Sequence, residues 1–274
     1  QVDEGEFVAL IGPNGAGKST LCYAVAGFVP HFFKGELTGT VEVAGRESSK
    51  SSLHEWVLNV GLAFQNPFNQ ISGAKYTVFE EIAFGLENIG VPREEMKQRV
   101  EDAMNLTGIR DLADRSPYSL SGGQQQRVAL TSILVMQPKV LVLDEPTSQM
   151  DPIGAREVFG VIRTMAEKGM MVILVEHKVE WIANFADRVV ALHEGQILLE
   201  GKPQEVLTSD LLTDKGFGIS RYTSVARRAK ELGLWKKEIL PVTLEQAVEG
   251  FSRPLTPNPS TLTGTHPKGE GSKR

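Results

Sequence analysis

Four short runs of consecutive apolar residues stand out along the chain. They lie at Val8–Ile11, Val140–Leu143, Met171–Val175 and Val189–Leu192. Continuous rather than alternating apolar residues are typical of strands buried on both faces, as in parallel sheets. The pattern therefore predicts a sheet that is mostly parallel.

Segments with helical character separate several of these runs. Gly17–Ala26 follows the first run, and Pro152–Lys168 lies between the second and the third. Strand–helix alternation predicts an α/β fold, whose ligands bind beyond the carboxyl ends of the strands. Polar or glycine-rich sequence follows three runs, at residues 12–14, 144–145 and 176–177. We expect these residues to converge on one site.

The remaining sequence predicts more peripheral elements. Glu36–Gly45 alternates Val and Thr with polar residues, which indicates a partly exposed strand. Apolar residues recur at helical spacing from Thr77, and Arg93–Leu106 is a charged amphipathic helix. A third helix is expected at Gln125–Met136.

These patterns divide the chain into four parts. An α/β core (residues 1–65 and 135–202) is interrupted by a helical subdomain (66–134) and followed by a small helical extension (203–251). Residues 252–274 are rich in Pro, Thr, Gly and Ser without periodicity, so we expect this tail to be disordered.

Composition excludes several classes of protein. The 274 residues carry a net charge of −5, which argues against nucleic acid as the main partner. A single cysteine, Cys22, rules out an intrachain disulfide and fits a reducing compartment; we interpret it as a core residue. No apolar run is long enough to cross a membrane, and no signal peptide is evident. The chain begins at Gln1 without a Met, and we expect native sequence to precede it.

A phosphate-binding loop follows the first predicted strand. It matches the pattern G-x-x-x-x-G-K-[ST], and the residues assigned to ATP binding are Gly12, Pro13, Asn14, Gly15, Ala16, Gly17, Lys18, Ser19 and Thr20. Its glycines let backbone N–H groups point at phosphate oxygens, and the following helix adds its positive end. Lys18 is expected to reach the β- and γ-phosphates, and Ser19 to bind Mg²⁺.

Two carboxylates and a histidine follow the other strands. We predict that Asp144 holds Mg²⁺ and that Glu145, on the opposite side of the pleat, activates water. A solvated pair of charges at a strand end is the alternative, which the phosphate loop disfavours. A histidine at the end of a strand is usually structural or exposed. His177, however, follows the third strand end that faces the same site, where it can donate a hydrogen bond to the γ-phosphate.

A second anion-binding helix start is predicted before Gln125. The segment Leu120, Ser121, Gly122, Gly123 and Gln124 places a Ser and two Gly at the start of a helix. This string resembles the signature sequence of the ABC ATPase family. The resemblance implies a P-loop NTPase core, and it implies that this segment completes the ATP pocket of a second subunit.

Other motifs of that family occur in the same order. Gln65 resembles the Q-loop glutamine, which contacts Mg²⁺ and takes part in catalysis while sensing a transmembrane partner. Asp151 matches the D-loop aspartate, although Gln149-Met150 departs from the usual Ala-Leu. His177 matches the switch histidine. The likeness extends to about residue 207, and the family's adenine-stacking aromatic would lie upstream of Gln1.

A narrower likeness concerns residues 65–70, 77–88, 176–178 and 186–189, which are similar to the ATPases of energy-coupling factor (ECF-type) importers. This implies ATP and Mg²⁺ as cofactors and a second ATPase subunit, the same or paralogous. It also implies a transmembrane coupling protein, a substrate-capture membrane protein, uptake of vitamins or metal ions, and a place on the cytoplasmic face of the cell membrane.

Two other functions remain open from the sequence. A soluble ABC ATPase of DNA repair would need a long coiled coil before the signature, and one of translation usually joins two ATPase units. A non-hydrolysing regulatory module would not need the complete set of catalytic residues. That set comprises Lys18, Gln65, Asp144, Glu145 and His177. The transported substrate is not indicated.

Overall fold

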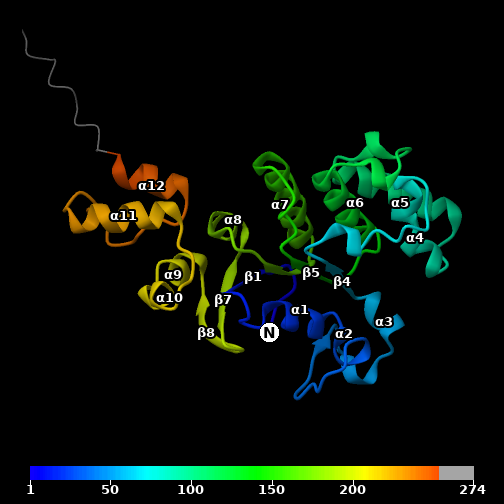
Figure 1. Cartoon of the computed structure of the whole chain (residues 1–274), viewed down its shortest axis with the longest axis horizontal. Coiled ribbons are helices and arrows are strands. Elements are labelled where there is room, and N and C mark those ends of the chain that lie inside the picture. Colours follow the sequence, from blue (N-terminus) through cyan, green and yellow to red (C-terminus); the bar gives the residue numbers. More distant parts are fainter. Residues whose placement is uncertain (253–274) are drawn as a thin grey trace, which may run out of the picture.

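The computed structural model describes residues 1–252 of the chain, so the predicted disorder of the tail falls, except for Ser252, outside the described residues. A six-stranded sheet forms the centre of the molecule (Figure 1), in the order β4-β5-β6-β1-β7-β8. Its strands are β1 (Phe7–Ile11), β4 (Val60–Ala63), β5 (Val140–Asp144), β6 (Met171–Val175), β7 (Arg188–His193) and β8 (Gln196–Gly201).

The predicted parallel sheet is confirmed. All neighbouring strands from β4 to β7 pair in parallel, and only β8 returns antiparallel along β7. The four apolar runs became β1, β5, β6 and β7. The strands β4 and β8, which flank them, were not among the predicted strands.

Alternate residues of each strand serve two separate layers. On one face, Val8 and Leu10 pack with Cys22 of α1 (Lys18–Val25) and with Trp56 of α3 (Leu53–Val57). On the other face, residues of β5 and β6 pack against α6 (Gly122–Leu134) and α7 (Pro152–Glu167). Burial of both faces explains why the strands are continuously apolar.

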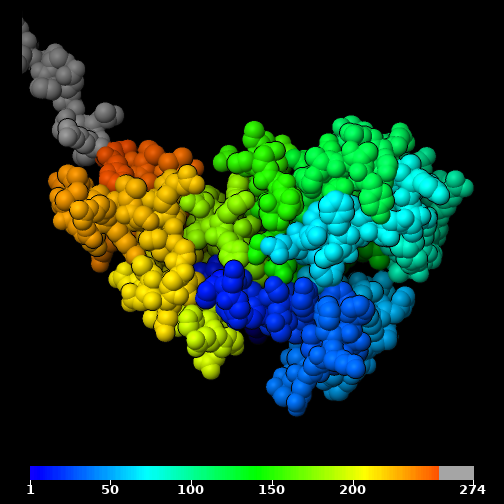
Figure 2. Space-filling view, in the orientation of Figure 1, coloured from blue at the N-terminus to red at the C-terminus, as the bar shows by residue number. Residues whose placement is uncertain are grey.

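Two groups of helices lie at opposite ends of the long axis (Figure 2). At one end, α4 (Val78–Asn88), α5 (Arg93–Leu106) and α6 share a core of their own. At the other end, the chain continues into α9 (Pro203–Leu207), α10 (Asp210–Asp214), α11 (Arg221–Glu231) and α12 (Leu244–Phe251). The helix α8 (Val179–Phe185) lies between this extension and the sheet. No helix among residues 1–252 has both the length and the apolar character that crossing a bilayer requires.

Two predicted boundaries were wrong. The strand expected over Glu36–Gly45 is reduced to β2 (Glu42–Val43), which pairs only with β3 (Arg46–Glu47). Most residues from 36 to 42 are exposed. The alternation of Val and Thr with polar residues there reflects β propensity, but this segment has no continuous apolar face to bury against the core. The helix expected from Gln125 begins at Gly122 instead, because the Ser121 hydroxyl caps it. The short helix α2 (Phe28–His31), which follows α1, was not predicted.

Two glycines, one in a strand and one in a helix, differ in how closely neighbouring side chains pack against them. A Cβ atom at Gly61 of β4 would lie 2.2 Å from a methyl carbon of Ile133 in α6, whereas nothing lies within 4 Å of one at Gly160 in α7. We expect Gly61→Ala to lower the free energy of unfolding by about 1–3 kcal/mol through overpacking. Gly160→Ala should raise it by about 0.5–1 kcal/mol, because alanine is the better helix former. Urea denaturation measures both, and equal stability of the two variants would contradict this packing.

Candidate active site

The phosphate loop connects β1 to α1 and needs glycine for two different reasons. Gly15 and Gly17 have φ values of 81° and 99°, a left-handed backbone that other residues adopt only with strain. Gly12 is required by close approach instead, since a Cβ there would lie 2.4 Å from the carbonyl oxygen of Leu192 in β7. The loop is thereby seated on the end of the sheet, and around Gly15 the space for a ligand is open.

Lys18 is the first residue of α1 and is folded back onto this loop. Its ammonium donates to the carbonyl oxygens of Gly12 at 2.8 Å and Pro13 at 3.1 Å. The residue is only 7% exposed. Burial lowers the pKa of Lys18, and the nearby carboxylates of Glu145 and Asp144 oppose that shift. A buried cation with carbonyl partners can exchange them for phosphate oxygens.

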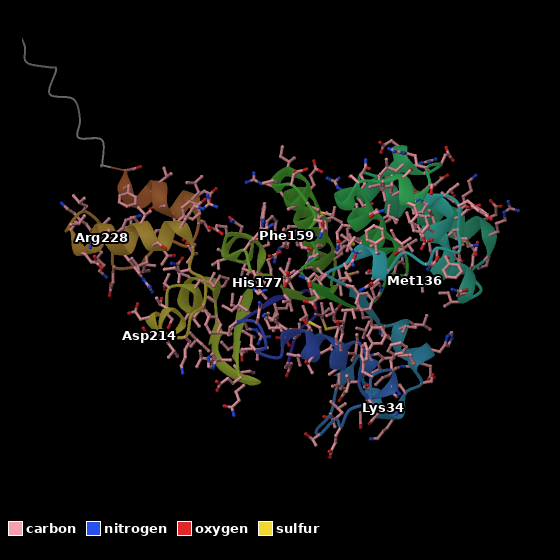
Figure 3. All side chains as sticks on the ribbon, viewed as in Figure 1. Lys34, Met136, Phe159, His177, Asp214 and Arg228 are labelled. Atoms are coloured by element: carbon pink, nitrogen blue, oxygen red, sulfur yellow. The ribbon has the colours of Figure 1, made fainter. Side chains whose placement is uncertain are left out.

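The predicted convergence of the strand ends is confirmed around Glu145. Its Oε2 accepts a hydrogen bond from Gln65 Nε2 at 2.8 Å, and its Oε1 lies 2.9 Å from His177 Nε2. These residues follow β4, β5 and β6, and their nearness comes from the parallel pairing of those strands. His177 lies near the middle of the molecule (Figure 3). Both carboxylate oxygens of Glu145 are thus occupied by side chains from neighbouring strands.

The expected position of Glu145 on the pleat of β5 was wrong. The strand β5 ends at Asp144, and Glu145 has a φ of 50°. The pleat alternation therefore stops one residue earlier, and a left-handed turn sets the direction of the side chain. Such a conformation is strained for a residue other than glycine and is often found at functional sites.

The residues expected to bind Mg²⁺ have suitable chemistry. Ser19, Asp144 and Gln65 all offer oxygen atoms, which Mg²⁺ prefers. Asp144 is buried at the end of β5, and its negative charge acts to raise the pKa of both Lys18 and Cys22. Among residues 1–252, no group of three or more His, Cys, Asp or Glu is arranged to hold a metal ion by itself. Such a site would draw on phosphate and water oxygens as well.

The signature segment forms a second, separate site. Ser121 caps α6, and Gln124 Oε1 accepts in return from the Ser121 backbone N–H at 3.0 Å. The helix start borders a hollow of about 490 Å³ that Arg127 and Asp151 also line, while no residue of the phosphate loop does. Asp151 caps α7, and the backbone N–H groups of Gly154 and Ile153 lower its pKa. The fold therefore keeps the two predicted phosphate sites apart within one chain.

Sequence reasoning missed two contributors to these sites. Arg127 borders the signature hollow and pairs with Glu157 of α7 at 2.5 Å. Residues 216–218 of the extension line a hollow of about 330 Å³ together with residues 12–14 and His177. Arg127 follows Gln124 at helical spacing on α6, but nothing in the local sequence indicates its pairing with α7. Only long-range packing brings residues 216–218 to the loop.

Comparisons with known proteins agree with this arrangement. The family model for ABC transporters matches residues 1–148. A protein of Pyrococcus horikoshii described as an ABC transporter ATP-binding protein is 42% identical over 251 residues, which cover 91% of this chain and 87% of the relative.

Two solved structures are also similar. CbiO1 of Clostridium perfringens, part of the ABC transporter complex CbiONQ, is 31% identical with a TM-score of 0.68, over 84% of this chain and 85% of CbiO1. The ATP-binding cassette MJ0796, a dimer in a post-hydrolysis state with ADP and phosphate, is 27% identical with a TM-score of 0.63. That match covers 74% of this chain and 88% of MJ0796.

The buried thiol next to the phosphate loop offers a direct test of this geometry. Cys22 of α1 is fully buried, and burial, with a contribution from Asp144, raises the pKa of its thiol to about 12. We expect no reaction of the folded chain with a thiol reagent at pH 8 and one equivalent of reaction after denaturation. Rapid labelling of the folded chain would show that α1 does not pack on the sheet as described.

Proposed function

Because the chain belongs to the ABC transporter family and is an ATPase of that family, we propose that it powers an importer of the energy-coupling factor type. In this proposal the ATPase dimerises around ATP and drives uptake of a vitamin or metal ion. The observation that carries the ATPase chemistry is the joining of Gln65, Glu145 and His177 beside Lys18.

The proposed reaction is in-line attack of water on the γ-phosphate. Glu145 orients the water and takes its proton, the bond from the γ-phosphorus to the bridging oxygen breaks, and ADP and phosphate form. Ser19, Asp144 and Gln65 would hold Mg²⁺, which would neutralise charge on the phosphate oxygens when bound. Lys18 exchanges its loop carbonyls for the β- and γ-phosphates. His177 releases Glu145 and donates to the γ-phosphate instead.

The separation of the two anion sites supports a dimer. Ser121 and Gly123 lie at a helix start that no phosphate-loop residue of the same chain borders. Two copies placed head to tail bring each signature segment onto the other's nucleotide, so that ATP joins the subunits. The partner is then either identical or a paralogue with the same two sites.

A groove on another side of the core is a suitable place for the membrane partner. It has a volume of about 730 Å³ and is lined by α5, by the segment from α6 to β5 and by the end of α7. It opens where β5 and β6 begin, whereas the nucleotide site lies where they end. A helix of the transmembrane coupling protein seated there would touch both the helical subdomain and the core. It would act on Gln65 only through them, because Gln65 lies at the edge of the sheet where the strands end.

The ECF-type assignment rests on sequence and on one neighbour. The stretches 65–70 and 77–88 carry the likeness to that subfamily. CbiO1, which shares the fold over most of both chains, is part of a transporter complex with several components. We therefore propose two kinds of membrane partner, a coupling protein and a substrate-capture protein, with the ATPases held on the cytoplasmic face.

Replacing the proposed base tests the chemistry. We expect Glu145→Gln to reduce ATP turnover at least about a hundredfold while ATP still promotes dimerisation, because charge at the base is lost and the phosphate contacts remain. Steady-state phosphate release and light scattering with Mg-ATP measure the two effects. The matched control is Glu167→Gln, at the exposed end of α7. Normal turnover in Glu145→Gln would remove Glu145 from the catalytic role.

Charge reversal at the groove tests the proposed docking place. Lys139 and Lys168 line it and are exposed. We expect the wild-type chain purified from native membranes to bring a coupling protein and a capture protein with it. The double variant Lys139→Glu/Lys168→Glu should lose at least about 90% of them through charge repulsion while keeping its ATPase activity.

The control for that experiment is Lys34→Glu, a single charge reversal at an exposed residue that lies at the lower edge of the molecule in Figure 3, away from the helix labelled α5 in Figure 1. Retention of both membrane proteins by the double variant would place the docking surface elsewhere. Absence of such proteins from the wild-type preparation would contradict the importer assignment itself.

A further inference from the structure

A buried carboxylate lies directly beside the histidine of the active site. Glu176 follows β6 and is only 5% exposed. Its Oε1 accepts hydrogen bonds from the backbone N–H groups of His177 at 2.8 Å and Lys178 at 3.1 Å. It thereby fixes the turn that carries His177, whose own side chain is 45% exposed.

The other oxygen of the same carboxylate reaches the neighbouring strand end. Glu176 Oε2 accepts a hydrogen bond from Thr147 Oγ1 at 2.9 Å, and Thr147 is fully buried. Thr147 lies between Glu145 and Ser148 in the loop that leads to Asp151. Ser148 in turn donates to the backbone carbonyl oxygen of Gln65 at 3.3 Å. One side chain therefore joins the loops after β5 and β6, and through them the loop after β4.

The chemistry of a buried carboxylate makes this link specific. An ionised carboxylate only accepts hydrogen bonds, and here each oxygen faces a donor from a different loop. Removing one donor would leave a buried oxygen without its partner, which is costly. The backbone adds only one further bond at this point, from the N–H of Glu145 to the carbonyl oxygen of Val175 at 3.0 Å. Glu176 therefore supports the relative placement of the two loops, together with this backbone bond and the contact of Glu145 with His177.

We propose that Glu176 is a positioning residue of the ATPase, which acts through Thr147 to hold His177 in register with Glu145 and with the loop that ends at Asp151. The inference rests on the proposed roles of Glu145 and His177. It adds that movement of the Asp151 loop, which lies at the proposed dimer interface, is passed to His177 through the Thr147 hydroxyl. Assembly of the dimer would then set the histidine for hydrolysis.

The test alters the single hydrogen bond from each side. Thr147→Val keeps the side-chain shape and deletes the hydroxyl, and Thr147→Ser is the matched control that retains it. Glu176→Gln keeps an oxygen for the two backbone N–H groups, but it removes the charge and leaves an amide N–H that can only donate to the Thr147 hydroxyl, which replaces a charge-assisted bond by a weaker, reversed one. We expect kcat for ATP to fall about ten- to a hundredfold in Thr147→Val and in Glu176→Gln. KM for ATP should change less than about threefold, and Thr147→Ser should stay within about threefold of the wild type in both constants.

The double variant Glu176→Gln/Thr147→Val separates positioning from general destabilisation. If the two residues act through one bond, its kcat should be close to that of either single variant rather than the product of both losses. ATP-promoted dimerisation in a Glu145→Gln background should be retained in each variant. If Thr147→Val does not fold, Glu176→Gln and its double variant still provide the comparison.

Several outcomes would overturn the inference. These are a wild-type kcat in Thr147→Val and Glu176→Gln, losses that multiply in the double variant, an equal loss in Thr147→Ser, or a rise in KM with kcat unchanged. Each would leave the proposed function intact as long as the wild-type chain hydrolyses ATP. Absence of hydrolysis by the wild-type chain would instead contradict the proposed function.

Discussion

Parallel pairing of β5 with β6 and of β6 with β1 is the constraint on which the site depends. It puts the ends of three strands at one edge of the sheet, and the residues that follow them become neighbours although up to 165 positions separate them, from Gly12 to His177. The phosphate loop, Glu145 and His177 owe their nearness to this register. The layers of helices on both faces are what permit such a sheet, because they bury its apolar strands.

Electrostatics at that edge is organised around few charges. Lys18 is buried against loop carbonyls, and the carboxylates of Asp144 and Glu145 partly offset the cost of keeping it charged. Glu145 is itself held by Gln65 and His177. A phosphate group entering this arrangement would meet a cation with replaceable partners and an acid whose neighbours can turn to other acceptors. These side-chain contacts are therefore compatible with the proposed chemistry.

The sequence was sufficient for what depends on local pattern. The apolar runs predicted four strands, and glycine with lysine at fixed spacing predicted the phosphate loop. It was insufficient where geometry depends on distant segments or on one backbone angle. The turn at Glu145 has a left-handed φ that the neighbouring residues do not predict. The contact of Glu176 with Thr147, and the approach of residues 216–218 to the loop, arise only once the strands are paired.

The self-capped start of α6 has a consequence for how subunits part. In the isolated chain the side chains of Ser121 and Gln124 accept hydrogen bonds from each other's backbone N–H groups, and this capping box provides no acceptor for the N–H groups of Gly122 and Gly123. A phosphate that binds the Ser121 hydroxyl must displace a contact that re-forms as soon as the phosphate leaves. The net attraction between two chains is thereby reduced by the contact that is given up. A dimer held by such contacts separates readily once ATP has been hydrolysed, as repeated rounds of hydrolysis require.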